Sequence, residues 1–256
     1  MAYAEALRRL LVGFQPSLEQ LYLLEPFQVE QLADRLDPRF MAGMCFVDPT
    51  LRRVLVAKHP PLGPYLDDLL GTYSGFGEVD EAHLWEIGEL LVYNCAPELY
   101  DAAVPGPDLN AIQDIAPLEG VVMDVGAGSG RLALGASRTA DVVYAVEPVE
   151  AMRRWIRQQA LHLGHSNVFV TDGFLHRIPF PDNTADVLIT RNALGWRLAE
   201  EIIEVDRIIK SDGTAIHLTG LPTSDASDSL DQALTQAGYQ CTPYPEGETW
   251  CRAYVK

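Results

Sequence analysis

Three glycines and an acid near the middle of this 256-residue chain have the types and spacing of a small-molecule binding turn. The segment VVMDVGAGSGRLAL (residues 121–134) is an apolar run that ends with Asp124. Its glycines follow at alternate positions, as Gly126, Gly128 and Gly130. Glycine lets a chain turn sharply and lets its backbone approach a ligand with no Cβ in between. If a helix begins there, its first amide groups favour a carboxylate or a phosphate.

Two further acids follow later apolar runs. Glu147 ends the run 142–147, where a carboxylate can accept hydrogen bonds from both hydroxyls of a ribose. Asp172 ends the run 167–172 and is followed by Gly173 and Phe174, an acceptor and an aromatic ring that suit an adenine. Three carboxylates form a poor site for a pyrophosphate. They suit a nucleoside that carries positive charge.

The elements that must position these residues alternate between strand and helix from about residue 118. Five short runs are rich in β-branched residues and nearly all apolar, which is typical of parallel strands buried on both faces. They are residues 121–125, 142–147, 167–172, 185–190 and 214–219. Helical patterns lie between several of them, at 129–138, 148–164 and 195–210. The alternation predicts a doubly wound, Rossmann-like α/β sheet that binds its ligand at the carboxyl ends of the strands.

The tail of the chain predicts a different arrangement. Residues 227–256 have the pattern of a helix, a strand, a hairpin turn at PEGE (245–248) and a last strand. Such a hairpin adds an antiparallel pair to an otherwise parallel sheet.

The first part of the chain has a helical pattern broken by proline and glycine. We expect helices at 2–13, 17–35, 64–70 and 80–94. The stretches 37–50 and 58–78 are otherwise irregular, and AAVPGPDLN (102–110) has the composition of a linker. We therefore expect a mainly helical region at 1–105 and an α/β domain at 106–256.

Charge and hydropathy limit the partners. The net charge is −17, with 36 acidic against 19 basic residues, so the chain lacks the basic surface that nucleic acids require. No apolar run reaches the length of a membrane span, and we expect no membrane insertion. The start of the chain has the pattern of an amphipathic helix and not of a signal peptide, which indicates a cytoplasmic protein.

The four cysteines favour reduced thiols over a zinc site. They show no CxxC spacing and no histidine at ligand distance, so we expect no metal. A hairpin that turned around Glu246 would place Cys241 opposite Cys251. Free thiols remain the favoured interpretation for a cytosolic chain.

Residues 115–220 resemble the class I S-adenosylmethionine-dependent methyltransferases, and most closely the small-molecule branch that includes ubiquinone/menaquinone-type ("type 11") enzymes. Four segments carry the resemblance: VVMDVGAGSGRLAL, VYAVEPVEAM, VTDGFLHRIPFPDNTADVLIT and RNALGWRLAEEIIEVDRIIKSDGTAIHL. The chain departs from the family at KSDGT, a variant of its usual turn, and at Gly195, where many members carry a histidine.

The resemblance implies a seven-stranded sheet, an S-adenosylmethionine cofactor converted to S-adenosylhomocysteine, and a set of cofactor-binding residues. The glycine turn would contact the methionine portion, Glu147 the ribose, and Pro148 the adenine. The implied set is Asp124, Gly126, Ala127, Gly128, Gly130, Glu147, Pro148, Asp172, Gly173, Phe174 and Arg191. Because the donor is already activated, a general base is needed only for an acceptor that arrives protonated.

The acceptor side offers fewer candidates, and its small-molecule acceptor is unidentified. They are His83, Tyr93, Asn192 and Trp196. The N-terminal helices are candidates for a substrate lid or for the surface of a homodimer. We expect His217 to be a core histidine and His176 to be exposed. Two other functions stay open, an NAD(P)-dependent oxidoreductase and a non-catalytic S-adenosylmethionine-binding protein.

Overall fold

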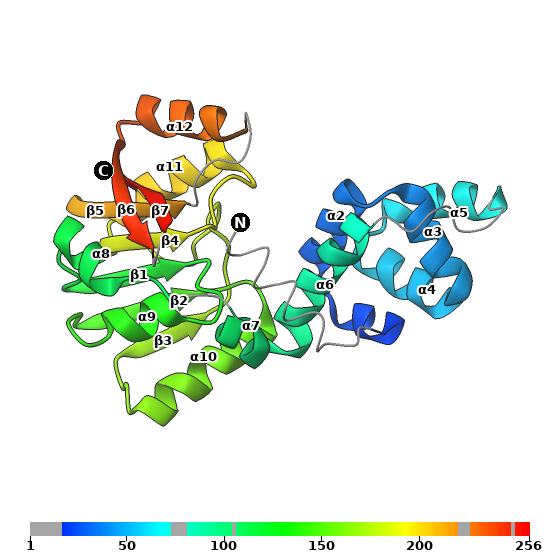
Figure 1. Cartoon of the computed structure of the whole chain (residues 1–256), viewed down its shortest axis with the longest axis horizontal. Helices are drawn as coiled ribbons and strands as arrows, with labels where there is room; N and C mark the ends of the chain where they lie inside the picture. The colour runs from blue at the N-terminus through cyan, green and yellow to red at the C-terminus, as the bar shows by residue number, and fades with distance from the viewer. Residues whose placement is uncertain (1–16, 73–80, 104–105, 220–225, 247–248) are drawn as a thin grey trace. The chain divides into compact units, whose positions relative to one another are not determined.

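The computed structural model covers the whole chain and describes residues 17–72, 81–103, 106–219, 226–246 and 249–256. It divides into two compact units, Met1–Val104 and Pro105–Lys256 (Figure 1). Each unit is described by itself below.

The described part of the first unit is helical. Its elements are η1 (Leu18–Leu23), α2 (Pro26–Arg35), α3 (Pro38–Val47), α4 (Pro49–Lys58), α5 (Leu62–Gly71), α6 (Glu81–Cys95) and α7 (Pro97–Ala103). The helices predicted at 64–70 and 80–94 correspond to α5 and α6. The helix predicted at 2–13 lies outside the described residues.

One prediction for this unit was wrong, and one stretch without a predicted element is helical. The single helix expected at 17–35 is interrupted, because Leu24 and Glu25 have extended ψ angles and Pro26 starts a new helix. The stretch 37–50, whose irregular pattern predicted no element, contains α3 and the start of α4. Asp37 accepts hydrogen bonds from Arg39 N (2.7 Å) and Phe40 N, and Asp48 accepts one from Thr50 N (2.9 Å). Each is an N-cap followed by a proline, a favourable start for a helix.

The second unit carries the sheet. Its helices are α8 (Leu109–Ile115), α9 (Arg131–Ala136), α10 (Glu150–Leu163), α11 (Leu198–Ile208) and α12 (Ala226–Gln236). Its strands are β1 (Val121–Val125), β2 (Val142–Val146), β3 (Val168–Thr171), β4 (Ala185–Arg191), β5 (Ile209–Thr219), β6 (Gln240–Glu246) and β7 (Thr249–Val255).

These seven strands form one sheet in the order β3-β2-β1-β4-β5-β7-β6. Strands β1 to β5 are parallel, and β7 pairs antiparallel with both β5 and β6. The predicted fold, a mostly parallel seven-stranded sheet closed by an antiparallel hairpin, is confirmed. From β1 the strand order runs outwards through β2 to β3, and the chain then returns to place β4 on the other side of β1. The order of the strands therefore reverses between β1 and β4, and ligands of doubly wound sheets bind at such a switch point.

Helices cover both faces of this sheet (Figure 1). Ile112, Leu132 and Ile156 pack α8, α9 and α10 on the face that also presents Val122. On the other face, Leu175, Val205 and Leu234 pack with Met123. Because neighbouring residues of a strand point to opposite faces, β1 contributes to both cores, and its apolar run is explained.

Strand β5 is longer than predicted. The KSDGT segment, expected to be a turn, lies inside it, and the pairing with β4 shifts between Ala185↔Ile209 and Val187↔Thr214. A Cβ at Gly213 would lie 2.9 Å from the carbonyl oxygen of Asp186, which explains why a glycine occupies this irregular position.

The hairpin also corrects the predicted position of two cysteines. Glu246 pairs with Thr249 as part of β6, so the hairpin does not turn around Glu246. Cys241 is therefore opposite Tyr254 and Cys251 opposite Tyr244. Neither cysteine forms a disulfide, and Cys251 is buried whereas Cys241 is exposed.

Candidate functional site

The glycine turn follows β1 at the switch point. Gly126, Gly128 and Gly130 have φ angles of +74°, +54° and +82°, values that side chains disfavour. A Cβ at Gly126 would lie 2.5 Å from the Cβ of Ala193, in the segment after β4. A Cβ at Gly130 would lie 2.7 Å from Ile156 of α10. The glycines therefore allow the turn to pack tightly against the segment after β4 and against α10.

Asp124, next to last in β1, is only 2% exposed. Its Oδ2 atom accepts a hydrogen bond from Ala133 N of α9 at 2.9 Å. Burial raises the pKa of this carboxyl to about 7, although the Ala133 amide and the charge of Arg191 act in the opposite direction.

Glu147 follows β2 and is 4% exposed. Its Oε2 accepts a hydrogen bond from Gly128 N at 2.8 Å, and its Oε1 accepts one from Val149 N at 2.9 Å. Burial raises the pKa of this carboxyl to about 7, despite those two amides, and nearby Asp124 adds to the rise. The amides of Gly128 and Ala133, in and after the turn, are thus already bonded to the protein's own carboxylates.

Arg153 of α10 links the ends of β2 and β3 and was not found by sequence reasoning. Its NH1 donates to the carbonyl oxygens of Glu147 (2.9 Å) and Pro148 (2.6 Å) and to Asp172 Oδ1 (3.0 Å). Asp172 remains 69% exposed at its side chain. The sequence contained a signal for this contact. An arginine in the first turn of a helix that starts just after Glu147 can reach back to the end of the preceding strand.

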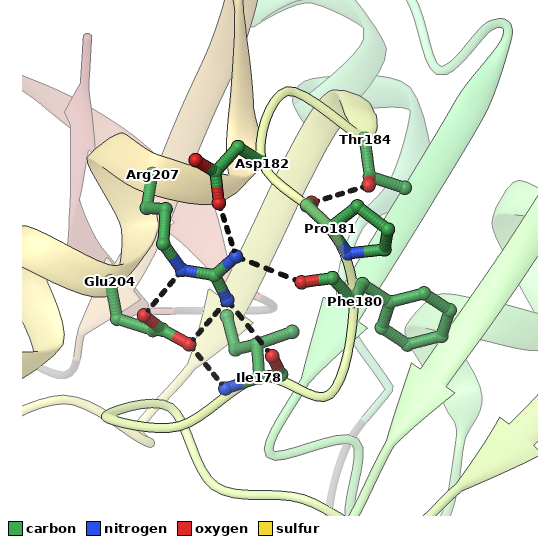
Figure 2. Close-up of polar contacts among 7 residues, drawn as sticks. All are labelled: Ile178, Phe180, Pro181, Asp182, Thr184, Glu204 and Arg207. Atoms are coloured by element: carbon green, nitrogen blue, oxygen red, sulfur yellow. Dashed lines mark hydrogen bonds and ion pairs between the residues drawn. The ribbon is translucent and has the colours of Figure 1, made fainter.

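The segment after β3 is fixed to α11 by one guanidinium group. Figure 2 shows Arg207 donating to the carbonyl oxygens of Ile178 (3.0 Å) and Phe180 (2.8 Å) and to Asp182 (2.8 Å). It also holds both carboxylate oxygens of Glu204 (2.8 and 2.7 Å), and Glu204 accepts a hydrogen bond from Ile178 N (2.6 Å). We call this group the Arg207 clamp.

The Arg207 clamp lowers the pKa of the Glu204 carboxyl and raises that of the arginine, in both cases through their mutual hydrogen bonds. Gly173 starts the clamped segment, and a Cβ there would lie 2.7 Å from Val146 and 2.8 Å from Pro179. The segment is therefore held close over the end of β2.

The segment after β4 is fixed in a similar way by Glu201 of α11. This buried carboxylate accepts hydrogen bonds from Gly195 N and Arg197 N, both at 2.8 Å. Asn192 has a φ of +55° and donates its backbone N–H to Leu218 O at 2.9 Å. Residues at the ends of β4, β5 and the hairpin line a shallow hollow: Arg191, Asn192, Leu218, Thr219, Tyr244 and Cys251.

Three aromatic rings from these two segments meet. The ring centroids of Phe174 and His176 are 5.3 Å apart and stacked, and Trp196 lies 5.7 Å from Phe174 and 5.6 Å from His176. We call them the three-ring cluster. His176 is half-buried and not exposed as predicted, because the other two rings cover it.

The acceptor-side candidates divide between the two units. The ring of Tyr93 of α6 contacts that of Tyr100 in the first unit, with centroids 4.6 Å apart and the rings tilted by 37°. The side chain of His83 lies outside what the structure describes. Asn192 and Trp196 lie after β4 in the second unit, and Trp196 is 37% exposed.

His217 is a core histidine, as predicted. It is fully buried, and its two ring nitrogens lie 2.8 Å from Thr190 Oγ1 and 3.1 Å from Tyr239 Oη. Burial lowers its pKa to about 3, so the ring stays neutral at physiological pH.

In the segments that the structure describes, no helix combines the length and hydropathy needed to cross a membrane. The same segments contain no group of three or more His, Cys, Asp or Glu side chains that could hold a metal ion.

Comparisons with known proteins single out the same part of the chain. The model of the family described as "Methyltransferase domain" matches residues 123–217. An uncharacterized methyltransferase, YcgJ of Bacillus subtilis strain 168, is 31% identical over 94 residues, which are 36% of this chain and 37% of that protein. The chain thus spans little more than a third of that curated relative.

The fold of the second unit is similar to that of a solved methyltransferase. A SAM-dependent methyltransferase from Aquifex aeolicus has a TM-score of 0.51 and 21% identity, over 58% of this chain and 88% of that one. The YcgJ structure from Bacillus subtilis has a TM-score of 0.47 and 20% identity, over 53% and 68% of the two chains.

Proposed function

We propose that this chain, whose residues 123–217 match the methyltransferase-domain model, is a class I S-adenosylmethionine-dependent methyltransferase that transfers a methyl group from S-adenosylmethionine to a small-molecule acceptor. The observation that carries the proposal is the contact of Glu147 with the glycine turn. This contact puts a buried carboxylate at the switch point of the sheet, beside a backbone that a ligand can approach closely.

The residues present fit the cofactor. S-adenosylmethionine carries a methyl group on a sulfonium, which supplies an activated methyl when bound. Glu147 would exchange an amide partner for the ribose hydroxyls, and Asp124 would face the cationic amino acid portion. The remaining proposed contacts are Gly126, Ala127, Gly128, Gly130, Pro148, Asp172, Gly173, Phe174 and Arg191.

The protein's own contribution is alignment and exclusion of water. The segments after β3 and β4 are each fixed to α11, by the Arg207 clamp and by Glu201. Such fixed walls hold an acceptor in line with the methyl group without a reorganisation at the moment of reaction.

The role of the first unit is part of the proposal. Its helices have a leucine-rich core of their own, so they can act as a body separate from the sheet. We assign them to a substrate lid or a homodimer surface.

We also place the protein in the cytoplasm. Its net charge of −17 disfavours a nucleic acid as the acceptor.

The two alternatives are not supported. Both the family match and the relative are methyltransferases, and neither an NAD(P)-dependent oxidoreductase nor a non-catalytic binding protein is among them.

Thermal unfolding of the full chain tests the proposal. S-adenosylmethionine, S-adenosylhomocysteine and NADH are compared in parallel. A ligand at 100 times its Kd stabilises by about 2.7 kcal/mol, which should raise Tm by about 5 °C or more for a chain of this size. A rise with both adenosyl ligands supports the proposal. A rise with NADH alone, or with none of the three, contradicts it.

A further inference from the structure

Resting on the proposed function, we infer that Arg153 is a positioning residue that sets the base selectivity of the cofactor site. Its guanidinium holds the Asp172 carboxylate in the orientation that accepts a hydrogen bond from the 6-amino group of an adenine. The site thereby selects an adenosyl cofactor over the inosyl analogue. The residues implied by the family resemblance include Asp172 and do not include Arg153.

Glu147 and Asp172 follow neighbouring parallel strands at the carboxyl edge of the sheet. Val146 of β2 pairs with Thr171 of β3, and the next amide, Glu147 N, donates to Thr171 O at 3.1 Å. Glu147 and Asp172 are therefore the first residues after two strands that end together. A nucleoside that Glu147 held by its ribose could reach Asp172 with its base.

The sheet by itself does not orient the Asp172 side chain. Strand β3 is at one end of the sheet, and Asp172 follows its last residue with 69% of the side chain exposed. An exposed carboxylate can adopt several rotamers, whereas a hydrogen bond to a base requires a defined direction. A contact that fixes the carboxylate before the cofactor binds reduces the entropy lost on binding.

Arg153 provides this contact from α10. Its side chain is only 14% exposed, and its NH1 donates to the carbonyl oxygens of Glu147 (2.9 Å) and Pro148 (2.6 Å) and to Asp172 Oδ1 (3.0 Å). Surface ion pairs contribute little when both side chains must be ordered. Here two backbone carbonyls already hold the guanidinium. Because Arg153 bonds to Oδ1, the other carboxylate oxygen can accept a hydrogen bond from a base.

A second arginine, one helical turn later on α10, holds the same strand. Arg157 NH2 donates to Val170 O at 2.9 Å. The carbonyls of Asn167 and Thr171 accept hydrogen bonds from the β2 side, so Val170 O lies on the free edge of β3. Helix α10 therefore fixes both the edge of β3 and the acid that follows it.

A fixed carboxylate at this position distinguishes adenine from hypoxanthine. Adenine carries an amino group at position 6, which donates a hydrogen bond, whereas hypoxanthine carries a carbonyl oxygen there, which accepts one. A carboxylate is an acceptor only, so it would bond to the first base and repel the second. A site built around a hydrogen bond rejects an analogue that cannot form it. If the carboxylate were free to turn into solvent, this rejection would be weaker.

The test measures the dissociation constants of S-adenosylhomocysteine and S-inosylhomocysteine by calorimetry with the full chain. The two ligands differ only in the base. We expect the wild type to bind the adenosyl ligand at least about tenfold more tightly, since hydrogen bonds to charged groups contribute about 1.5–3 kcal/mol. Arg153→Met keeps the apolar stem and removes the guanidinium. It should lose most of this preference, with weaker adenosyl binding and nearly unchanged inosyl binding.

The ratio of the two constants separates positioning from a structural role. If Arg153 only supported the fold of the strand ends, Arg153→Met would weaken both ligands equally and leave the ratio unchanged, which would overturn the inference. Arg154→Met is the matched control. Arg154 is the next residue of α10, is 65% exposed and pairs with Glu150 at the surface (3.8 Å), so its loss should change neither constant.

A double-mutant cycle tests whether Arg153 acts through Asp172. Asp172→Asn offers the base both a donor and an acceptor, so it should also lose the adenosyl preference. The variant that carries both changes should have the same ratio as either single variant. A further, additive loss in the double variant would show that Arg153 acts independently of Asp172 and would overturn the inference.

Arg153→Lys keeps a cation but not the planar group that contacts two carbonyls and a carboxylate, so its ratio should lie between those of the wild type and Arg153→Met. If Arg153→Met does not fold, Arg153→Lys and Asp172→Asn decide, and a wild-type ratio in either overturns the inference. A wild type that binds S-adenosylhomocysteine without preferring it to the inosyl ligand overturns the inference alone. A wild type that binds neither ligand contradicts the proposed function, and the inference fails with it.

Discussion

The carboxylate of Glu147 lies 2.8 Å from the amide nitrogen of Gly128, so the acid that ends one strand closes the turn that follows its neighbour. The two residues are 19 positions apart in sequence and come together because β1 and β2 are adjacent and parallel. Their contact gives the first prediction.

Glu147→Gln should weaken S-adenosylmethionine binding by about ten- to a hundredfold, because hydrogen bonds to a charged group contribute about 1.5–3 kcal/mol. Calorimetry with the purified chain measures the loss. Glu150→Gln is the matched control, since Glu150 is exposed at the start of α10 and pairs with Arg154 at the surface. Equal affinity of the Glu147 variant and the control would remove Glu147 from the site.

The second prediction concerns pH. The folded pKa of Asp124 is about 7, above its ordinary value of 3.8, so the folded state holds this proton more tightly than the unfolded state does. The stability that protonation gives is complete below pH 3.8 and is lost as pH rises towards 7. Asp124→Asn keeps an oxygen for the Ala133 amide and removes the buried charge.

We therefore expect Asp124→Asn to be more stable than the wild type above pH 7, by up to about 4 kcal/mol, and to show a flatter stability profile between pH 4 and 7. Urea unfolding across that range measures both effects. The pKa of Glu147 is also raised, so the stability of the variant should still decrease as pH rises, although less steeply than that of the wild type. A variant as pH-dependent as the wild type would contradict this account of Asp124.

The sheet and the glycine turn could be predicted because their signals are local. Apolar β-branched runs and alternate glycines depend on residues within a few positions of each other, and the structure keeps them. In the first unit the same kind of signal was present but was missed at Asp37-Pro38 and Asp48-Pro49, where an N-cap precedes a proline.

The surroundings of the site could not be predicted in this way. Arg207 contacts Ile178 and Phe180, which are 29 and 27 positions away, and Trp196 meets His176 across two loops. The hydrophobic periodicity of the sequence does not predict such pairs, because they depend on how α11 packs on the sheet. The burial of His176 is a consequence of that packing.

The third prediction tests the Arg207 clamp. Arg207→Ala removes hydrogen bonds to two backbone carbonyls and two carboxylates, so we expect a loss of about 2–3 kcal/mol in unfolding free energy and a weaker affinity for S-adenosylhomocysteine. Lys256→Ala is the control. This variant removes a surface ion pair with Asp206, the neighbour of Arg207 on α11. Because this pair holds no backbone carbonyl, its loss should lower the unfolding free energy by less than about 1 kcal/mol.

Arg207→Lys adds a further readout, because a lysine keeps the charge but cannot make the forked contacts. We expect it to recover only a small part of the stability. Full recovery would show that charge alone matters and that the geometry of the clamp does not. Chemical denaturation and calorimetry on the same preparations distinguish the two outcomes.

The fourth prediction separates backbone strain from crowding in the glycine turn. Gly126 and Gly164 have almost the same φ, +74° and +73°, but a Cβ at Gly126 would lie 2.5 Å from Ala193, whereas a Cβ at Gly164 would have no atom within 4 Å. Gly164→Ala should therefore cost only the left-handed conformation, about 1–2 kcal/mol. Gly126→Ala adds the steric conflict with the segment after β4, for a total of about 2–5 kcal/mol. Because Gly126 is one of the proposed cofactor contacts, Gly126→Ala should also weaken S-adenosylhomocysteine binding, and Gly164→Ala should not. Equal losses of stability in the two variants would show that Ala193 moves aside easily.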